Sequence, residues 1–359
     1  MPAFFPISFL ILGLMSLILH SIYVHSRFGV KDVPNERSLH DTVTKKSGGM
    51  FFIPVFLIST LLYLTGPVGF GFPNPETLTN QVSNVYLLLA GVFVFSILGF
   101  IDDLIHLSPK LRLFLELGIV WLCLWVTTPN ISFMTYTEIP SYAIILFLTV
   151  FLVFGINLVN FMDGMDWYLV STFFICFFSV GLCDLPFYTF PNLGYILYAI
   201  LFVSMFGFIF YNFPKAKLFM GDSGSLALGF FVFFLPLLSN PLTEGSNRGQ
   251  VVRWDVLDYF YLFPFFWIDG ITILLKRFSE KKHLFQAHRE HLYQTLTETN
   301  VGKVGSLVVF SLLNGLVLGI HILLVQWEIG KLLTFTILFL ISLLLYGIVW
   351  VWTSRKNLA

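Results

Sequence analysis

The sequence predicts an all-α polytopic membrane protein with about eleven transmembrane helices. Of its 359 residues, 57% are hydrophobic and only 11% are charged, whereas about a quarter of the residues of a soluble domain are charged. The mean hydropathy is +0.85, so most of the surface is expected to contact lipid. The apolar runs give the number of helices, and the basic residues between them give the direction of the chain.

A helix needs about 20 mostly apolar residues to cross the hydrocarbon core of a bilayer. Runs of this kind occupy residues 6–26, 50–65, 85–101, 112–128, 139–156, 168–183, 193–211, 223–239, 257–275, 304–325 and 332–353. The first run has no basic residue before it and no small-residue cleavage site after it, so it is expected to be a retained helix. No connection is long enough to fold separately, which predicts a single integral membrane domain over residues 1–359.

Lys and Arg residues fall almost entirely on one side of the predicted helices. That side holds the connections 27–49, 102–112, 156–168, 212–222 and 276–303 and the C-terminal tail. Of the 20 basic residues, only Arg248, Arg253 and Lys331 fall on the opposite side. Because basic residues accumulate in cytoplasmic connections, these five connections are predicted to be cytoplasmic and catalytic, with the N-terminus outside and the C-terminus in the cytoplasm.

The formal net charge of the chain is zero, which argues against nucleic acid as the main partner. Cys123, Cys176 and Cys183 lie in or beside apolar runs, and their spacing matches neither a metal site nor a secreted disulfide framework. They are interpreted as small buried hydrophobic residues. Candidate functional residues are therefore sought among the acidic and polar residues near the helix ends.

An acidic pair, Asp102-Asp103, follows the apolar run that ends at Ile101. Carboxylates near a membrane span are costly and usually functional, and two adjacent carboxylates repel each other unless a cation neutralises them. Two interpretations stay open. The residues are either a structural pair at the start of a loop or ligands for a hard divalent cation, which prefers oxygen donors.

Four polar residues recur at every third position: Asn157, Asn160, Asp163 and Asp166. At helical spacing they would form one polar stripe on an otherwise apolar strip, which packing alone does not explain. Gly164, between the last two, would allow a turn or the close approach of a ligand. The segment is therefore predicted to be functional.

A run of small residues, 221–225, follows Asn212 and leads into an apolar run. It predicts a loop that ends at a helix N-terminus, where unpaired backbone N–H groups favour phosphate. Within it, Asp222 is placed to bind a metal ion that bridges phosphate oxygens.

The segment 281–291 is basic and ends in His288, Arg289 and His291. Arginine suits bidentate phosphate binding, and histidine titrates near neutral pH. Asp269, inside an apolar run, either belongs to the same site or pairs with a neighbour. Carboxylates for a divalent cation and cationic groups for phosphates together indicate an enzyme that acts on a phosphorylated donor at the membrane surface.

These motifs, in this order, resemble those of the polyprenyl-phosphate N-acetylhexosamine-1-phosphate transferases (glycosyltransferase family 4). The superfamily includes phospho-MurNAc-pentapeptide translocase and the WecA-type GlcNAc-1-phosphate transferases. The resemblance runs from about Asp32 to Gln294. It also includes an early loop with Pro34, Asn35, Arg37, His40, Gly48 and Gly49. It looks closest to bacterial members, WecA- and WbpL-like, that start O-antigen or similar surface polysaccharides.

The resemblance implies that the chain transfers N-acetylhexosamine 1-phosphate from a UDP-sugar to undecaprenyl phosphate and releases UMP. Mg²⁺, or alternatively Mn²⁺, would neutralise the charge on the phosphate oxygens. The implied setting is the bacterial inner membrane, which the chain crosses several times. The implied partners are the UDP-N-acetyl sugar, the lipid phosphate and the bilayer, and a homodimer is left open.

The same resemblance gives each motif residue an expected role. Asp222 is expected to ligate the metal ion, with Asp103 beside it. Asp102 or Asp103 would act as a base on the lipid phosphate or assist the metal, and His288 is expected to be catalytic. The expected substrate-binding residues are Asn157, Asn160, Asp163, Asp166, Asn212, Arg289 and His291.

Departures from the family pattern put the sugar in question more than the reaction. The segment 44–49 lacks the usual prolines, and Trp167 stands where a glycine commonly follows the equivalent of Asp166. The His288 block differs from the consecutive histidines of the peptidoglycan branch. The alternatives are therefore a phospho-MurNAc-pentapeptide translocase, a dolichyl-phosphate enzyme, and a membrane transporter. A transporter would have charged groups at mid-membrane, whereas here they lie near one face.

Overall fold

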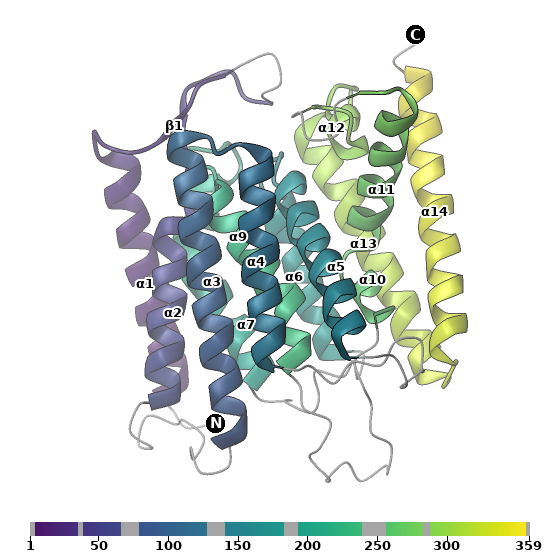
Figure 1. Ribbon diagram of the computed structural model, residues 1–359. Helices are drawn as coiled ribbons and strands as arrows, with labels where there is room; N and C mark the ends of the chain where they lie inside the picture. Colours follow the sequence, from purple (N-terminus) through teal and green to yellow (C-terminus); the bar gives the residue numbers. More distant parts are fainter. Residues whose placement is uncertain are drawn as a thin grey trace.

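The computed structural model describes residues 4–34, 39–65, 79–127, 141–182, 193–238, 256–282 and 288–356. This part of the chain is a bundle of helices that stand side by side (Figure 1). The helices are α1 (Phe4–His25), α2 (Gly49–Thr65), α3 (Thr79–Ile105), α4 (Pro109–Thr127), α5 (Ser141–Met162), α6 (Tyr168–Leu182), α7 (Leu193–Ser204), α8 (Phe206–Asn212), α9 (Asp222–Phe234), α10 (Asp258–Leu262), α11 (Pro264–Ser279), α12 (Leu292–Thr297), α13 (Gly302–Gln326) and α14 (Lys331–Lys356).

The predicted apolar runs coincide with helices, so the chain is a mostly helical, polytopic membrane protein. Within the described ranges, five helices are long and apolar enough to cross a membrane. They cover Ser8–His25, Ser83–Ile105, Tyr142–Met162, Gly302–Gln326 and Lys331–Arg355. Their outward faces carry large exposed apolar side chains such as Leu10, Leu146 and Leu344, which suits contact with lipid tails.

Two of the predicted runs are interrupted, contrary to the expectation of one helix each. The run 193–211 divides into α7 and α8 at Met205, and the run 257–275 divides into α10 and α11 at Phe263. Pro264 explains the second break. A proline has no N–H group and fits best in the first turn of a helix, and Pro264 is the first residue of α11.

Helix α9 lies in the centre of the bundle against α2, α3 and α5. Its residues from Ser223 to Phe234 are all buried. A Cβ atom on Gly99 of α3 would collide with the backbone of Asp222, so glycine brings the two helices into direct backbone contact. Further along α9, the ring of Phe233 stacks on that of Tyr259, with centroids 5.4 Å apart.

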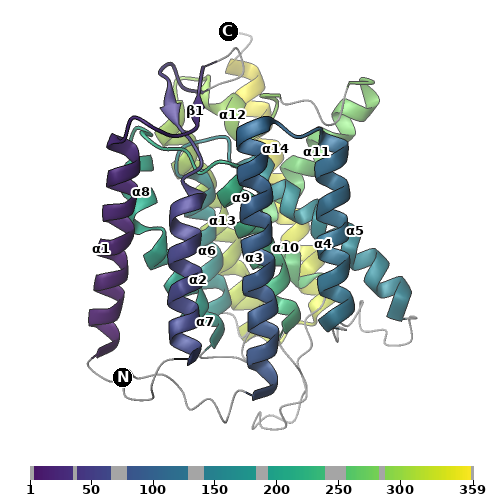
Figure 2. The same ribbon diagram turned by 60° about the vertical axis from the view of Figure 1, so that its left-hand side comes forward.

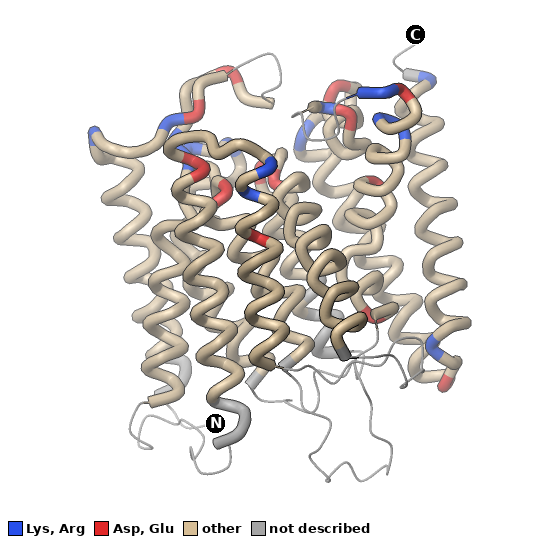
Figure 3. Tube along the Cα trace, in the orientation of Figure 1, with Lys and Arg blue, Asp and Glu red and all other residues tan. Residues whose placement is uncertain are grey.

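Charged residues gather at one end of the bundle, where β1 and α12 lie (Figure 3). The strands β1 (Lys31–Asp32) and β2 (Thr44–Lys45) pair antiparallel at that end. Lys45 is also bridged to Leu218 in the loop before α9. Figure 2 shows β1, α12 and one end of α3 and α4 on this same side. The predicted functional segments are thereby brought to one end of the protein.

Candidate active site

Carboxylates from α3, from α9 and from the connection after α5 form a cluster at the charged end. Asp102 and Asp103 lie in the last turn of α3, rather than in a loop as expected, and Asp222 is the first residue of α9. Asp102 is 7% exposed and Asp103 is 4% exposed. Each carboxylate therefore needs a partner for its charge.

Arg112 of α4 is the cation that joins these carboxylates. Its Nη1 atom donates to Asp102 Oδ2 at 2.8 Å and to Asp222 Oδ2 at 3.1 Å. Its Nε atom lies 3.5 Å from Glu116 Oε1, one helical turn away, and its Nη2 atom donates to Asn157 Oδ1 at 3.4 Å. A guanidinium group of the protein itself therefore relieves much of the repulsion that the sequence predicts.

Asp103 occupies the N-terminus of α9. It accepts the backbone N–H groups of Asp222 and Ser223 at 3.3 Å and 3.4 Å and the hydroxyl of Ser47 at 2.7 Å. Lys46 Nζ lies 3.4 Å from Asp103 Oδ1. The predicted transition from loop to helix is confirmed. Its N–H groups are not free for a phosphate, however, because a carboxylate of the chain takes the position that the helix dipole favours for an anion.

Asn157 and Asn160 of α5 support the carboxylates. Asn160 Nδ2 donates to Asp222 Oδ1 and to Ser225 Oγ, both at 2.9 Å. Asn157 Nδ2 donates to Glu116 Oε2. Of these two predicted substrate-binding residues, Asn160 therefore lies directly on Asp222, and Asn157 belongs to the Arg112–Glu116 pair.

The polar stripe predicted for α5 is only half helical. The helix ends at Met162, so Asp163 and Asp166 lie in the connection to α6. Burial raises the pKa of Asp163 well above its usual range, and the carboxylates of Asp222, Asp103 and Asp166 raise it further. Asp163 thus belongs to the cluster. The expectation of one continuous helical stripe is wrong.

Asp166 stands at the side of the cluster nearest α13. Burial raises its pKa, while Lys303 at the start of α13 lowers it from a distance of 3.7 Å. This ion pair ties the α5–α6 connection to α13. The structure therefore gives Asp166 a protein partner as well as a place near the site.

Asn212 braces two connections. Its Oδ1 atom accepts the backbone N–H of Trp167 at 2.8 Å, and its Nδ2 atom donates to Leu218 O at 2.9 Å. Trp167 has a φ of 65°, in the left-handed region that favours glycine, and its ring packs on Phe213 with centroids 4.7 Å apart. Trp167 therefore has a backbone conformation that suits glycine, the residue that is common at this position in the family pattern.

The histidine block is anchored to the helices at two points. His291 Nδ1 lies 2.8 Å from Asp269 Oδ2, so Asp269 pairs with a neighbour, one of the two roles left open. Glu290 lies 2.8 Å from Arg277 Nη1, 3.3 Å from Lys282 Nζ and 3.4 Å from Lys276 Nζ. The backbone of the block is therefore fixed on α11.

His288 and Arg289 are the members of the block with the weakest protein contacts. Burial, together with the nearby His291 and Arg277, lowers the pKa of His288 to about 4. His288 is therefore uncharged at neutral pH and can accept a proton. Arg289 Nη1 lies 4.0 Å from Glu298 Oε1, and its buried Nε atom has no hydrogen-bond partner among the described residues.

Tyr293 connects the histidine block with the α5–α6 connection. Its hydroxyl donates to Phe161 O at 3.4 Å, and a Cβ atom on Gly164 would collide with this hydroxyl and with the Gln294 side chain. Gly164 thus allows a close approach, as expected, but the approaching groups belong to the protein. The structure brings the histidine block and the acidic segment together through this contact.

The cluster suits a divalent cation by its chemistry. Asp222, Asp103 and Asp163 provide oxygen donors whose mutual repulsion a cation would relieve. In the described part of the chain, no three His, Cys, Asp or Glu side chains have metal-ligand geometry. Mg²⁺ commonly binds through one or two carboxylates and completes its coordination with water and substrate phosphates. The residues therefore fit such an ion bound together with a phosphorylated substrate.

Two residues of this site were not identified from the sequence. Glu116 is fully buried in α4, and Arg112 was treated only as a cytoplasmic basic residue. Their signal is a single carboxylate inside an apolar run, four positions after an arginine, which is the spacing of a helical ion pair. Asn35 and Arg37 of the early loop lie outside the described residues.

Residues 85–240 match the model of a family described as glycosyl transferase family 4. The matched segment contains Asp102, Asp103 and Asp222 and the α5 amides.

Three relatives of the chain have names that describe them as transferases. The chain is 26% identical over 301 residues to decaprenyl-phosphate N-acetylglucosaminephosphotransferase of Mycobacterium tuberculosis, covering 76% of this chain and 70% of the relative. It is 24% identical over 338 residues to undecaprenyl-phosphate alpha-N-acetylglucosaminyl 1-phosphate transferase of Escherichia coli O157:H7, covering 90% and 84%. It is 32% identical over 201 residues to phospho-N-acetylmuramoyl-pentapeptide-transferase of a Picosynechococcus species, covering 52% and 50%.

Proposed function

We propose that the chain is a member of glycosyl transferase family 4, whose model matches residues 85–240, and that it transfers N-acetylhexosamine 1-phosphate from a UDP-sugar to undecaprenyl phosphate. The product is a lipid-diphospho-sugar that starts O-antigen or a related surface polysaccharide. One observation carries this proposal. Asp103, Asp163 and Asp222 form one cluster with Arg112 at the charged end of a lipid-facing bundle. Acidic groups for a cation and a guanidinium group for phosphate are what this transfer requires.

The reaction is a displacement at phosphorus. An oxygen of the lipid phosphate forms a bond to the sugar-side phosphorus of the donor, and the bond from that phosphorus to the bridging oxygen breaks, so that UMP leaves. A phosphate monoester is already largely ionised at neutral pH, so the acceptor has little need of a base. We assign Asp102 and Asp103 to holding Arg112 and Lys46, because their oxygens already accept from these cations.

A bound Mg²⁺ would neutralise charge on the donor pyrophosphate. Asp222 is its proposed ligand, with Asp103 and Asp163 beside it. Asn160 holds the Asp222 carboxylate in orientation through its amide. His288 is uncharged at neutral pH and, with Arg289 and His291, is proposed to contact the phosphates or the sugar. Asn157, Asp166 and Asn212 are proposed to shape the nucleotide-sugar pocket.

The same premise supports a topology and a location. We propose about eleven spans in the bacterial inner membrane, the N-terminus outside, and the C-terminus in the cytoplasm. The shorter helices would cross as the successive pairs α7–α8 and α10–α11 and as α9 with the 3-10 helix Leu235–Leu238. Labelling of single cysteines in intact cells at position 110 and at position 328 tests this orientation. A cysteine at position 110 is expected to be inaccessible to a membrane-impermeant reagent, because it lies in the cytoplasm, and a cysteine at position 328 is expected to be labelled.

A second candidate is a phospho-MurNAc-pentapeptide translocase. It is favoured by the 32% identity to a relative of that name, although that alignment covers about half of each chain. The histidine block differs from the consecutive histidines of the peptidoglycan branch, which favours a simple N-acetylhexosamine donor.

The test is release of UMP by the purified protein given undecaprenyl phosphate and a UDP-sugar, with Mg²⁺ or with EDTA. UDP-GlcNAc, UDP-FucNAc and UDP-MurNAc-pentapeptide are compared as donors. Metal-dependent UMP with one of the first two supports the proposal, and UMP only with the third supports the translocase. UMP with none of them would contradict both.

A further inference from the structure

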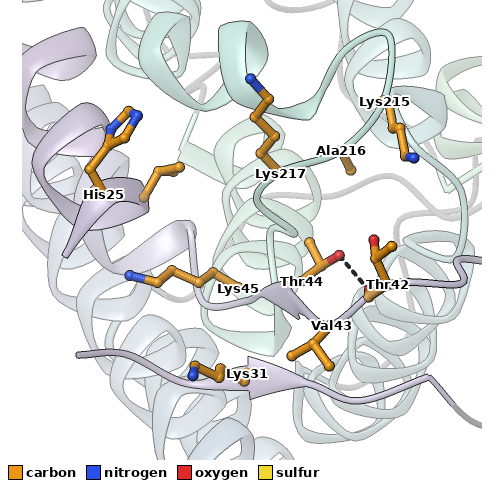
Figure 4. Close-up of a pocket in the computed structure, with 10 residues that line it drawn as sticks. His25, Lys31, Thr42, Val43, Thr44, Lys45, Lys215, Ala216 and Lys217 are labelled. Atoms are coloured by element: carbon orange, nitrogen blue, oxygen red, sulfur yellow. Dashed lines mark hydrogen bonds between the residues drawn. The ribbon is translucent and has the colours of Figure 1, made fainter. Parts of the chain in front are cut away.

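A second site lies at the charged end of the bundle beside α1. It is a cavity of about 710 Å³, within the range of small-ligand sites. Its walls are the end of α1, the strands β1 and β2, and the loop that follows α8 (Figure 4). None of the carboxylates of the candidate active site lines this cavity.

The cavity is strongly basic. Its lining includes His25, Lys31, Lys45, Lys215 and Lys217 and no acidic residue. Figure 4 shows His25, Lys215 and Lys217 on one side and Lys31 and Lys45 on the strands opposite. The positive charges come from three separate parts of the chain, so the fold collects them.

Three of these lysines have no carboxylate partner. Within the described residues, Lys31, Lys215 and Lys217 form no ion pair. By contrast, Lys46 and Lys303 at the same end of the bundle pair with Asp103 and Asp166. The lysines around the cavity are therefore available for an anion from outside the protein.

Lys45 lines the cavity and is held in place by backbone carbonyl groups. Its Nζ atom donates to the carbonyl oxygens of Tyr23, Ser26 and Phe28 at 2.5 Å, 2.7 Å and 2.9 Å. Burial lowers the pKa of Lys45, and the nearby Lys31 lowers it further. Lys45 thus fixes β2 to the end of α1 and leaves the cavity with uncompensated positive charge.

An apolar rim is formed by Val43, which lines the cavity, and by Phe28 and Val33, which lie close to β1 in the sequence. Phe28 is 85% exposed, Val33 is 63% exposed and Val43 is 57% exposed. The apolar span of α1 ends at His25, so the rim lies where hydrocarbon gives way to headgroups. Apolar side chains next to lysines at this depth suit the boundary between acyl chains and headgroups.

We propose that this cavity binds the phosphodiester headgroup of an anionic membrane phospholipid. Lys31, Lys215 and Lys217 hold the phosphate, and the side chains of Phe28 and Val43 contact the acyl chains. The loop wall is bonded to β2, because Phe219 N donates to Lys45 O at 2.8 Å. A bound headgroup therefore braces the loop that ends at Asp222.

The test uses the full chain purified in detergent, and its readout does not depend on turnover. Native mass spectrometry and thermal unfolding compare phosphatidylglycerol with phosphatidylcholine of the same acyl chains. Glycerol 3-phosphate and undecaprenyl phosphate are added in separate arms. The variant Lys31→Ser/Lys217→Ser is compared with Lys110→Ser/Lys281→Ser, which removes the same charge from exposed lysines outside the cavity.

Phosphatidylglycerol is expected to remain bound and to raise the Tm, and phosphatidylcholine is not. Binding to the cavity variant should weaken roughly 30-fold, from the usual contribution of two lysines near an anionic surface, and binding to the control should hardly change. If the double variant does not fold, each single variant should show a roughly fivefold loss.

Equal retention of phosphatidylglycerol by both double variants would overturn the proposal. So would binding of glycerol 3-phosphate as tight as that of the lipid, since this would make the cavity a site for soluble anions. Displacement of phosphatidylglycerol by undecaprenyl phosphate, dependent on Lys31 and Lys217, would assign the cavity to the acceptor instead.

Discussion

His291 and Asp269 form a buried pair that fixes the histidine block. His291 Nδ1 lies 2.8 Å from Asp269 Oδ2, and the two residues are 5% and 1% exposed. The other carboxylate oxygen accepts the backbone N–H of Leu292 at 2.9 Å and the hydroxyl of Tyr346 at 2.8 Å. One carboxylate thus joins α11, α12 and α14, and it positions His288 without facing a ligand itself.

Replacing Asp269 tests whether this residue positions the histidine block without taking part in the reaction. Asp269→Asn keeps the shape but removes the charge from a buried pair, which costs about 3 kcal/mol of unfolding free energy. Tyr346→Phe removes one hydrogen bond and should cost about 1 kcal/mol. Unfolding in detergent measures both. Turnover should fall in the same order, and an unchanged Tm in Asp269→Asn would contradict this role.

Asp222→Asn and Asp102→Asn should each abolish UMP release while the protein stays folded. The first removes the proposed metal ligand, and the second releases Arg112 from one of its three site carboxylates. Turnover should fall at least about 100-fold, as it does when a preorganised electrostatic contact is lost. Glu328→Gln, an exposed carboxylate remote from the cluster, is the control. Normal turnover in Asp222→Asn would contradict the metal-site proposal, and normal turnover in Asp102→Asn would contradict the role given to Arg112.

Glu116→Gln should weaken the protein although it adds no bulk. Glu116 accepts a hydrogen bond from the Asn157 amide and faces Arg112 Nε. A glutamine has one NH2 group in place of one carboxylate oxygen, so its NH2 group would face either the Asn157 amide or Arg112 Nε, both of which are donors. A loss of about 1–3 kcal/mol is expected for the unsatisfied buried group. Chemical unfolding measures this loss. Stability equal to that of the unmodified chain would mean that the pair contributes nothing.

His288 should make stability depend on pH. Its pKa is about 4 in the folded chain, below the ordinary value of 6.5, because of burial. Between these two values the unfolded chain binds more protons, so unfolding becomes more favourable as the pH falls from about 6.5 towards 4. His288→Asn should therefore lose less Tm between pH 7 and pH 4.5 than the unmodified chain does. Parallel Tm curves would contradict the assignment.

Trp167→Gly and Trp167→Ala should differ in an unusual direction. Both remove the ring that packs on Phe213, but only glycine adopts a φ of 65° without strain. Trp167→Gly should therefore be more stable than Trp167→Ala by about 1 kcal/mol, the reverse of the ordinary order. Thermal unfolding of the two variants gives the difference. The KM for the UDP-sugar should change in both if Trp167 shapes the sugar pocket.

The sequence predicts where most helices lie, and it predicts the grouping of the motifs at one end. Long apolar runs are a local signal, and the small residues 221–225 mark the start of α9. The end of α5 was misplaced because the three-residue spacing of polar groups continues past Met162, where the helix stops. Periodicity cannot reveal a helix end that contacts from α12 determine, such as that of Tyr293 on Gly164.

The partners of the site carboxylates could not be predicted for a different reason. Asp103 caps α9 across 119 positions of the sequence, and Arg112 reaches Asp222 across 110. Such pairings depend on how helices pack, and no local pattern encodes them. Glu116 could not be identified because it lies inside an apolar run, where side chains are expected to pack or to contact lipid, and only the fold shows its partners.

The backbone contact between Gly99 and Asp222 has a consequence for how such an enzyme can diverge. Since no side chain separates α3 from α9 at this point, the spacing of Asp103 and Asp222 is set by two main chains and not by replaceable packing. In the described residues, side chains such as Tyr293 and Asn212 link the histidine block and the α5–α6 connection to their neighbours. Donor preference can therefore change through substitutions in those contacts, while the distance between the Asp103 and Asp222 carboxylates is inherited unchanged.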